Sequence, residues 1–170
     1  LVGRERTFAD VVSWSINNSD SVTAVSESLK QDTLEHFNIN REIDVVPNFI
    51  DFNRFNKKPR DHFKTAIAPG GEKLLVHTSN FRKVKRVQDV VEVFAKVFPS
   101  IPSKLLVIGD GPERSNIEQK CRELSMSDHI IFMGKQEAVE EILSVCDLFI
   151  LPSEKESFGL SALEAMACEV

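Results

Sequence analysis

Two glutamates near the end of the chain flank a short segment that contains a glycine. The segment reads "ESFGLSALE", with Glu156 at its start and Glu164 at its end. A carboxylate accepts hydrogen bonds on two oxygens, which suits it to hold a vicinal diol such as that of a ribose or a hexose. A helix that begins near Phe158 would supply backbone N–H donors to a phosphate, and Gly159 lets such a group approach closely. The alternative is that both glutamates are ordinary surface charges of a helix.

A second candidate for chemistry is a basic loop. Within "FRKVKR", four of the five residues from Arg82 to Arg86 are positively charged, the others being Lys83 and Lys85, in a chain whose net charge is -5. A helix that follows the loop would add the partial positive charge of its N-terminus. The combination predicts a phosphate-binding site, and the competing interpretation is a solvated charge run.

The elements that must position these residues are predicted by short apolar runs that alternate with helical patterns. Runs at 73–79, 104–110, 129–134 and 147–152 each precede a helix-like stretch, which predicts a parallel sheet with helices on both faces. Ligands of such sheets bind beyond the carboxyl ends of the strands. The loops expected at that edge carry Asn80, Arg82, Lys83, Lys85, Arg86, Asp110, Lys135, Glu154 and Glu156.

The first third of the chain is organised differently. "SVTAVS" (21–26) and "IDVVP" predict two short strands, and Ser26 is the expected N-cap of an intervening helix. Residues 48–72 contain prolines, glycines and charges without a period, so we expect a linker or a long loop there. The chain stops inside an apolar helix-like pattern without a glycine or polar cap, from which we expect a fragment.

Composition narrows the classes of function. The 170 residues are 42% hydrophobic, as in ordinary soluble domains, and the acidic balance disfavours nucleic-acid and anionic-membrane partners. No apolar run reaches the roughly 20 residues of a membrane-spanning helix, so a cytoplasmic location is expected. The three cysteines are far apart in the sequence, so we expect no disulfide. The four histidines are scattered and there is no Asp-x-Asp, so we expect no metal site. His77 lies inside an apolar strand, and we expect it to have a structural role.

"GDGPER" is a weaker signal. Gly109 and Gly111 permit a tight turn from strand to helix, but Glu113 and Arg114 stand where the G-x-G-x-x-G dinucleotide fingerprint would continue. A nicotinamide-dependent oxidoreductase would share the sheet, and it would need that fingerprint and an acidic residue about 20 positions on. We therefore interpret "GDGP" mainly as a turn.

The ordered motifs resemble those of the family 4 retaining glycosyltransferases, which have the GT-B fold. The motifs are "SVTAVSESL", "VVPNFID", "LVIGDGPER" and the E-x7-E pattern of "ESFGLSALEAMAC", and they cover nearly the whole chain. The resemblance implies a Rossmann-like nucleotide-sugar domain at 73–170, truncated at its C-terminus. It also implies an interdomain linker at 48–72, and at 1–47 the tail end of a preceding Rossmann-like domain on the acceptor side.

The resemblance also implies roles for the basic residues. Lys85 matches the family's phosphate-binding lysine and is expected to act in catalysis by neutralising the departing diphosphate. Asn80 stands where many members have an arginine, so Arg82 or Arg86 is expected to complete the phosphate clamp.

For the remaining site the resemblance places Glu156, as a catalytic residue, near the hydroxyls of the donor sugar and Glu164 on the ribose diol. The other donor-binding residues implied are Gly109, Lys135, Gln136, Phe158, Gly159 and Leu160, with the backbone of the last three at the sugar and diphosphate and the turn at 134–136 at the base.

The activity implied is transfer of a sugar from a UDP-sugar to a small hydroxyl acceptor, with retention of anomeric configuration and without a metal or other cofactor. "HTSNFRKVKR" and "LPSEKESFGL" resemble enzymes of bacillithiol biosynthesis, which makes N-acetylglucosamine the expected sugar and L-malate the expected acceptor. A nucleotide-sugar epimerase and a non-catalytic nucleotide-sugar-binding module of the same fold stay open as alternatives, and so does homo-oligomerisation.

Overall fold

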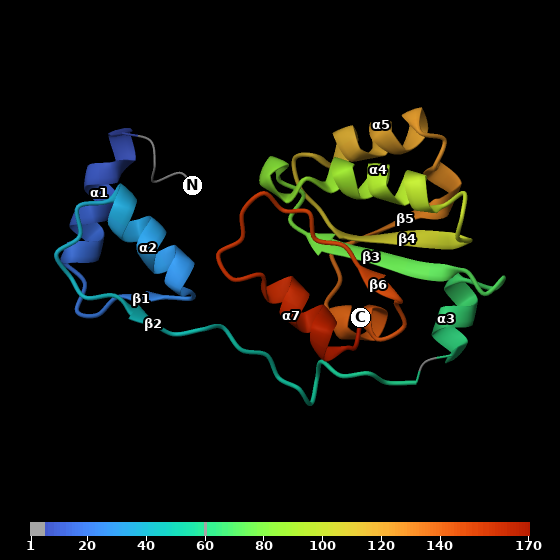
Figure 1. The fold of residues 1–170 in the computed structure, drawn as a ribbon, viewed down its shortest axis with the longest axis horizontal. Coiled ribbons are helices and arrows are strands. Elements are labelled where there is room, and N and C mark those ends of the chain that lie inside the picture. Colours follow the sequence, from blue (N-terminus) through green and yellow to red (C-terminus); the bar gives the residue numbers. More distant parts are fainter. Residues whose placement is uncertain (1–5, 60) are drawn as a thin grey trace. The chain divides into compact units, whose positions relative to one another are not determined.

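The computed structural model describes residues 6–59 and 61–170, and the chain divides between Phe49 and Ile50 into two compact units. The described part of the first unit contains α1 (Arg6–Asn17), β1 (Thr23–Ala24), α2 (Glu27–His36) and β2 (Asp44–Val45) (Figure 1). The two strands pair in parallel, with Thr23 opposite Asp44. Each strand has two residues, so both are shorter than the apolar runs that predicted them.

Helix α2 begins directly after the residue that the sequence predicted as its N-cap. Ser26 is the N-cap, and its hydroxyl accepts a hydrogen bond of 3.1 Å from the backbone N–H of Leu29. This bond satisfies one of the donors that the first turn of a helix leaves unpaired. The predicted cap is confirmed.

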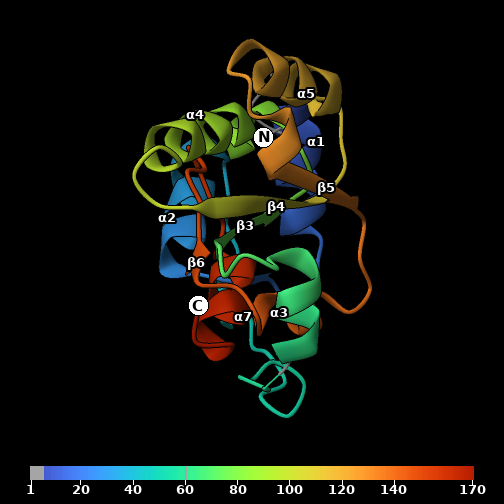
Figure 2. The same ribbon diagram turned by 90° about the vertical axis from the view of Figure 1, so that its right-hand side faces the viewer.

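The second unit is built on a four-stranded parallel sheet, in the order β5-β4-β3-β6. Its strands are β3 (Lys73–Ser79), β4 (Ser103–Gly109), β5 (Ile130–Gly134) and β6 (Leu148–Phe149). Helices α4 (Val87–Val97) and α5 (Arg114–Glu123) cover one face, and α3 (Asp61–Ile67), α6 (Val139–Leu143) and α7 (Leu160–Ala167) cover the other (Figures 1 and 2). Two short 3-10 helices, η2 (Lys83–Lys85) and η3 (Ser127–His129), lie in loops. The predicted α/β architecture with helices on both faces is confirmed.

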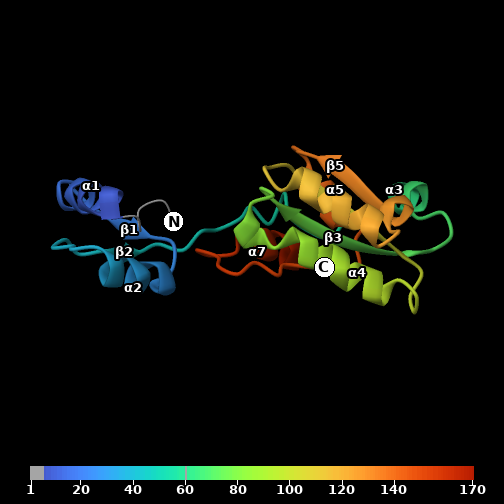
Figure 3. The ribbon, with the colours of Figure 1, turned by 90° about the horizontal axis from the view of Figure 1, so that it is seen from above.

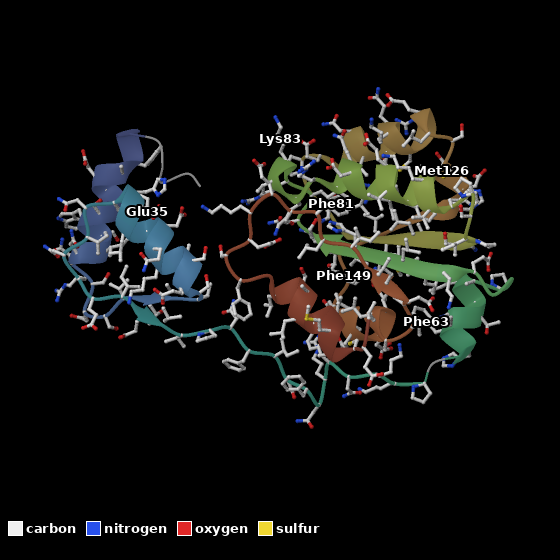
Figure 4. The ribbon with its side chains drawn as sticks, in the orientation of Figure 1. Glu35, Phe63, Phe81, Lys83, Met126 and Phe149 are labelled. Carbon is white, nitrogen blue, oxygen red and sulfur yellow. The ribbon has the colours of Figure 1, made fainter. Side chains whose placement is uncertain are left out.

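Alternation along the strands produces two cores. Successive side chains of a strand point to opposite faces, so Leu74 and Val76 pack toward α6 and α7, whereas Leu75 packs toward α4. Seen from above, α4 and α5 lie over the strands (Figure 3). In Figure 4, Phe63 and Phe149 belong to the first core, and Phe81 and Met126 to the second. Burial of both faces explains why the strands read as continuous apolar runs.

The structure differs from the sequence-based expectation within 48–72. Helix α3 lies inside this segment, and Phe55 and Ala68 are buried in the core of the second unit. The helix has seven residues, about two turns, which is too short to display a clear helical period. Much of the expected linker is therefore part of the folded second unit.

Helix α7 ends within the chain, although the sequence shows no glycine cap there. Glu169 adopts a left-handed conformation with a φ of 60°, and the N–H of Val170 donates to the carbonyl of Ala165 over 3.1 Å. This bond pattern usually has glycine at the left-handed position.

Among the helices that the structure describes, none is long and apolar enough to cross a membrane.

Candidate functional site

The candidate site lies where the strand order reverses. Strand β3 is flanked by β4 on one side and by β6 on the other, so the loops that follow β3 and β6 begin at a topological switch point. Open parallel sheets bind ligands at such points. The two loops run together there, because the N–H of Glu154 donates to the carbonyl of Val84 over 2.9 Å.

An ion pair joins the basic loop to the first glutamate at this point. The Lys85 Nζ donates to the Glu156 Oε1 over 2.6 Å, and the two side chains are 20% and 26% exposed. Burial raises the pKa of Glu156, but the hydrogen bond and charge of Lys85 outweigh it, so this pKa lies below its ordinary value. Glu156 is thus a carboxylate, and its ion pair holds the partly buried Lys85 side chain at the switch point.

The second glutamate lies in a different environment. Helix α7 begins at Leu160, two residues later than expected, so Glu164 is about one turn inside it. Burial raises the pKa of Glu164, an effect that Arg54 opposes and Glu140 reinforces. Unlike Glu156, this carboxylate is not held by a lysine, and its partial burial favours a ligand that donates hydrogen bonds to it.

Arg54 is a neighbour of Glu164 that the sequence did not single out. Its Nη2 donates to the Glu137 carbonyl over 2.7 Å and to the Glu140 Oε2 over 3.0 Å. These bonds fasten the segment after Phe49 to the start of α6. No periodicity or spacing marks this arginine, since its partners lie more than 80 positions away in the sequence.

Between the glutamates, Gly159 caps the N-terminus of α7 in a left-handed conformation with a φ of 84°. Apart from atoms of the adjoining chain, no heavy atom lies within 4 Å of the place where a Cβ would stand, so the backbone here borders open space. Phe158 is partly buried and Leu160 is exposed. The Ala162 N–H donates to the Gly159 carbonyl over 2.9 Å, and the N–H groups before it at the start of α7 can be reached by an anion.

The remaining basic residues of the loop lie apart from this pair. Arg82, Lys83 and Arg86 line a surface cavity of about 440 Å³, together with residues from the start of α4 and with Glu113 and Glu154. Arg86 forms an ion pair with Asp89, and Lys83 points away from α7 (Figure 4). Asn80 is exposed directly after β3. That Arg82 or Arg86 completes a phosphate clamp stays a prediction.

The glycines of "GDGP" have a packing role. At Gly109, whose φ is 117°, an added Cβ would stand 1.9 Å from the Ser79 carbonyl oxygen, and at Gly111 it would stand 2.9 Å from the backbone of Phe81. The Glu113 N–H also donates to the Phe81 carbonyl over 2.9 Å. The glycines thus bring the loop after β4 against the loop after β3. A contact of Gly109 with a donor stays a prediction.

The loop after β5 lies at the same edge of the sheet. Lys135 and Gln136 are exposed, and Lys135 lines a surface hollow of about 250 Å³ with Asp110 and Gly111. Gly134 has a φ of 66°, which aids the sharp exit from the strand. Their expected position at the base of a nucleotide stays a prediction.

The cysteines do not contribute to this edge. Cys121, Cys146 and Cys168 are buried and free, and burial raises the pKa of Cys121 to about 11 and that of Cys146 to about 12. A thiol with such a pKa is a poor nucleophile at neutral pH. Within residues 6–59 and 61–170, no group of three or more histidine, cysteine, aspartate and glutamate side chains is placed to hold a metal ion.

Comparison with known proteins gives the following similarities. Residues 58–170 match the family model for glycosyl transferases group 1, and residues 2–54 match that for glycosyltransferase family 4. The whole chain is 46% identical to the N-acetyl-alpha-D-glucosaminyl L-malate synthase of Bacillus anthracis, of which it covers 45%. The chain therefore spans about half the length of this curated relative.

Solved structures are similar at lower identity. HepE from Anabaena, in complex with UDP and glucose, has a TM-score of 0.84 at 20% identity, over 95% of this chain and 46% of that one. Sucrose-phosphate synthase from Thermosynechococcus elongatus has a TM-score of 0.83 at 23% identity, over 96% of this chain and 42% of that one. These similarities concern the fold.

Proposed function

The chain belongs to the glycosyl transferases group 1 family, as its motifs predicted, and from this membership we propose that it carries the donor site of an enzyme that transfers a sugar from a UDP-sugar. The proposal depends most on the Lys85–Glu156 pair, which lies at the switch point of the sheet. A partly buried ammonium and an accessible helix N-terminus at one place suit a diphosphate.

The proposed chemistry follows from charge. Breaking the bond between a sugar carbon and a diphosphate builds negative charge on the leaving oxygen. Lys85 and the N–H groups at the start of α7 would stabilise that charge more in the transition state than in the ground state. When the diphosphate engages Lys85, Glu156 is free to accept hydrogen bonds from the hydroxyls of the transferred sugar.

The rest of the donor would extend along α7. Glu164 is proposed to accept hydrogen bonds from the ribose diol, and its partial burial strengthens such bonds. The turn at 134–136 is proposed to lie at the base. In this arrangement Glu156 holds the sugar and Glu164 holds the ribose of one donor molecule. Their positions on either side of Gly159 would then match the two ends of the diphosphate.

For the substrates we propose N-acetylglucosamine as the sugar and L-malate as the acceptor. The support is the name of the B. anthracis relative together with its 46% identity. We also propose that the reaction needs no metal ion, because Lys85 and the helix N-terminus supply the positive charge that a metal would otherwise provide.

Sugar transfer tests the proposal. A longer protein that carries this chain with a complete first domain is expected to convert labelled UDP-N-acetylglucosamine and malate to a glycoside in the presence of EDTA. The anomeric coupling in the proton NMR spectrum of the product should match that of the donor. An epimerised nucleotide sugar, or donor binding without consumption, would support one of the alternatives, and activity only with added divalent cations would contradict the metal-free mechanism.

A further inference from the structure

One buried polar side chain lies at the switch point without being part of the proposed donor contacts. His77 in β3 has no exposed surface. Its Nδ1 lies 2.8 Å from the Ile150 carbonyl oxygen, and its Nε2 lies 2.8 Å from the Ser79 Oγ. The imidazole therefore contacts the last residue of its own strand, Ser79, and the first residue of the chain that leaves β6.

The partners define which ring nitrogen carries hydrogen. A carbonyl oxygen can only accept, so Nδ1 must be the protonated nitrogen. Burial lowers the pKa of His77; the Ile150 carbonyl opposes this, Lys85 adds to it, and Glu156 opposes it. The ring is therefore neutral near pH 7, and Nε2 accepts the hydrogen bond that the Ser79 hydroxyl donates.

This geometry ends the pairing of β6 with β3 at a defined residue. The ladder pairs Val76 with Phe149, and the Ile150 N–H donates to the Val76 carbonyl over 2.9 Å. The Ile150 carbonyl instead accepts the hydrogen bond from the His77 Nδ1–H. Both backbone groups of Ile150 are thus fixed, and the loop that leaves it reaches Glu156 six positions later.

We propose that His77, as a neutral imidazole with hydrogen on Nδ1, is a positioning residue that holds the root of the β6–α7 loop and thereby places Glu156 against Lys85. The inference rests on the proposed function, because its consequence for binding concerns the diphosphate site. His77 is proposed to touch neither the donor nor the reacting atoms. It acts through Ile150, which begins the β6–α7 loop. The hydrogen bond from the Glu154 N–H to the Val84 carbonyl then connects this loop to η2, which contains Lys85.

Three substitutions in this 170-residue chain test the inference, with UDP as the probe and calorimetry as the measurement. His77→Leu removes both ring nitrogens and should weaken UDP binding about tenfold, the size expected when a buried hydrogen bond is lost. His77→Asn places an amide N–H at the same number of bonds from Cα as Nδ1, so it should recover most of the affinity. His77→Gln places its amide one carbon farther out and should not.

A separate measurement of unfolding distinguishes positioning from stability. If His77 only stabilised the fold, the leucine variant would unfold more easily while its folded fraction bound UDP like the parent, and this result would overturn the inference. Equal losses for the asparagine and leucine variants would do the same. Absence of UDP binding by the unsubstituted chain would overturn the proposed function itself.

The tautomer can be measured without any substitution. Long-range nitrogen–proton NMR spectra of the labelled chain are expected to show His77 with a protonated Nδ1 and an unprotonated Nε2 near pH 6.5, where an ordinary histidine is half protonated. A proton on Nε2 alone, or titration like that of an exposed histidine, would contradict the inference even if the leucine variant does not fold.

Discussion

Replacement of Lys85 by alanine is expected to reduce turnover about a hundredfold in a longer protein that carries this chain with a complete first domain. The ammonium is held at the switch point, 2.6 Å from Glu156, so it needs no reorganisation when charge builds on the leaving diphosphate. Loss of one preorganised contact of this kind typically costs about 3 kcal/mol in the barrier. Steady-state transfer and donor binding, measured side by side, should show a larger loss in turnover than in affinity.

A matched control comes from the helix that follows the basic loop. Lys96 is an exposed lysine in the last turn of α4, at the helix end farthest from the basic loop. Lys96→Ala removes the same charge from the chain and should leave turnover unchanged. If Lys85→Ala raised the Michaelis constant and left turnover intact, Lys85 would be a plain binding residue.

The two glutamates are expected to differ when each is replaced by glutamine, which keeps the shape and removes the charge. Glu156→Gln should lower turnover at least about tenfold with a smaller effect on affinity, because Glu156 lies beside Lys85 and is proposed to hold the transferring sugar. Glu164→Gln should weaken donor affinity about tenfold and change turnover less, because the ribose does not react.

Calorimetry of UDP-N-acetylglucosamine binding, combined with steady-state transfer, separates the two effects for each variant. Glu141→Gln is a suitable control, since Glu141 is an exposed glutamate on the neighbouring helix α6. If both glutamine variants bound and reacted like the parent, Glu156 and Glu164 would be surface charges and the functional interpretation of "ESFGLSALE" would be wrong.

The sheet and its helices could be predicted because their signals are local. Strand β3 has the same bounds as the apolar run at 73–79, and Ser26 caps α2 as its side chain and position indicate. The predicted run at 147–152 was too long by comparison, since only Leu148 and Phe149 pair with β3. Apolar residues that bury against helices look the same in sequence whether or not they join a ladder.

The features that sequence missed depend on contacts between distant residues or on backbone conformation. Arg54 becomes a neighbour of Glu164 only because the chain folds back onto α6. Within the basic loop, Lys85 forms an ion pair with Glu156, whereas Arg82 and Arg86 line a separate cavity. Arg86 has a φ of 50°, a left-handed conformation that its type does not favour, so the direction of its side chain could not be inferred from spacing.

Chemical-shift mapping shows whether a UDP-sugar binds, as proposed, at the switch point between β3 and β6. UDP would be added to the nitrogen-15-labelled chain in the presence of EDTA, and the backbone amides followed by NMR. We expect saturable shifts concentrated at 79–86 and 153–164, around Lys85, Glu156 and Glu164, with a third group at 134–136. Shifts confined to the cavity lined by Arg82, Gln88 and Glu113, or no saturable shifts at all, would contradict the proposal.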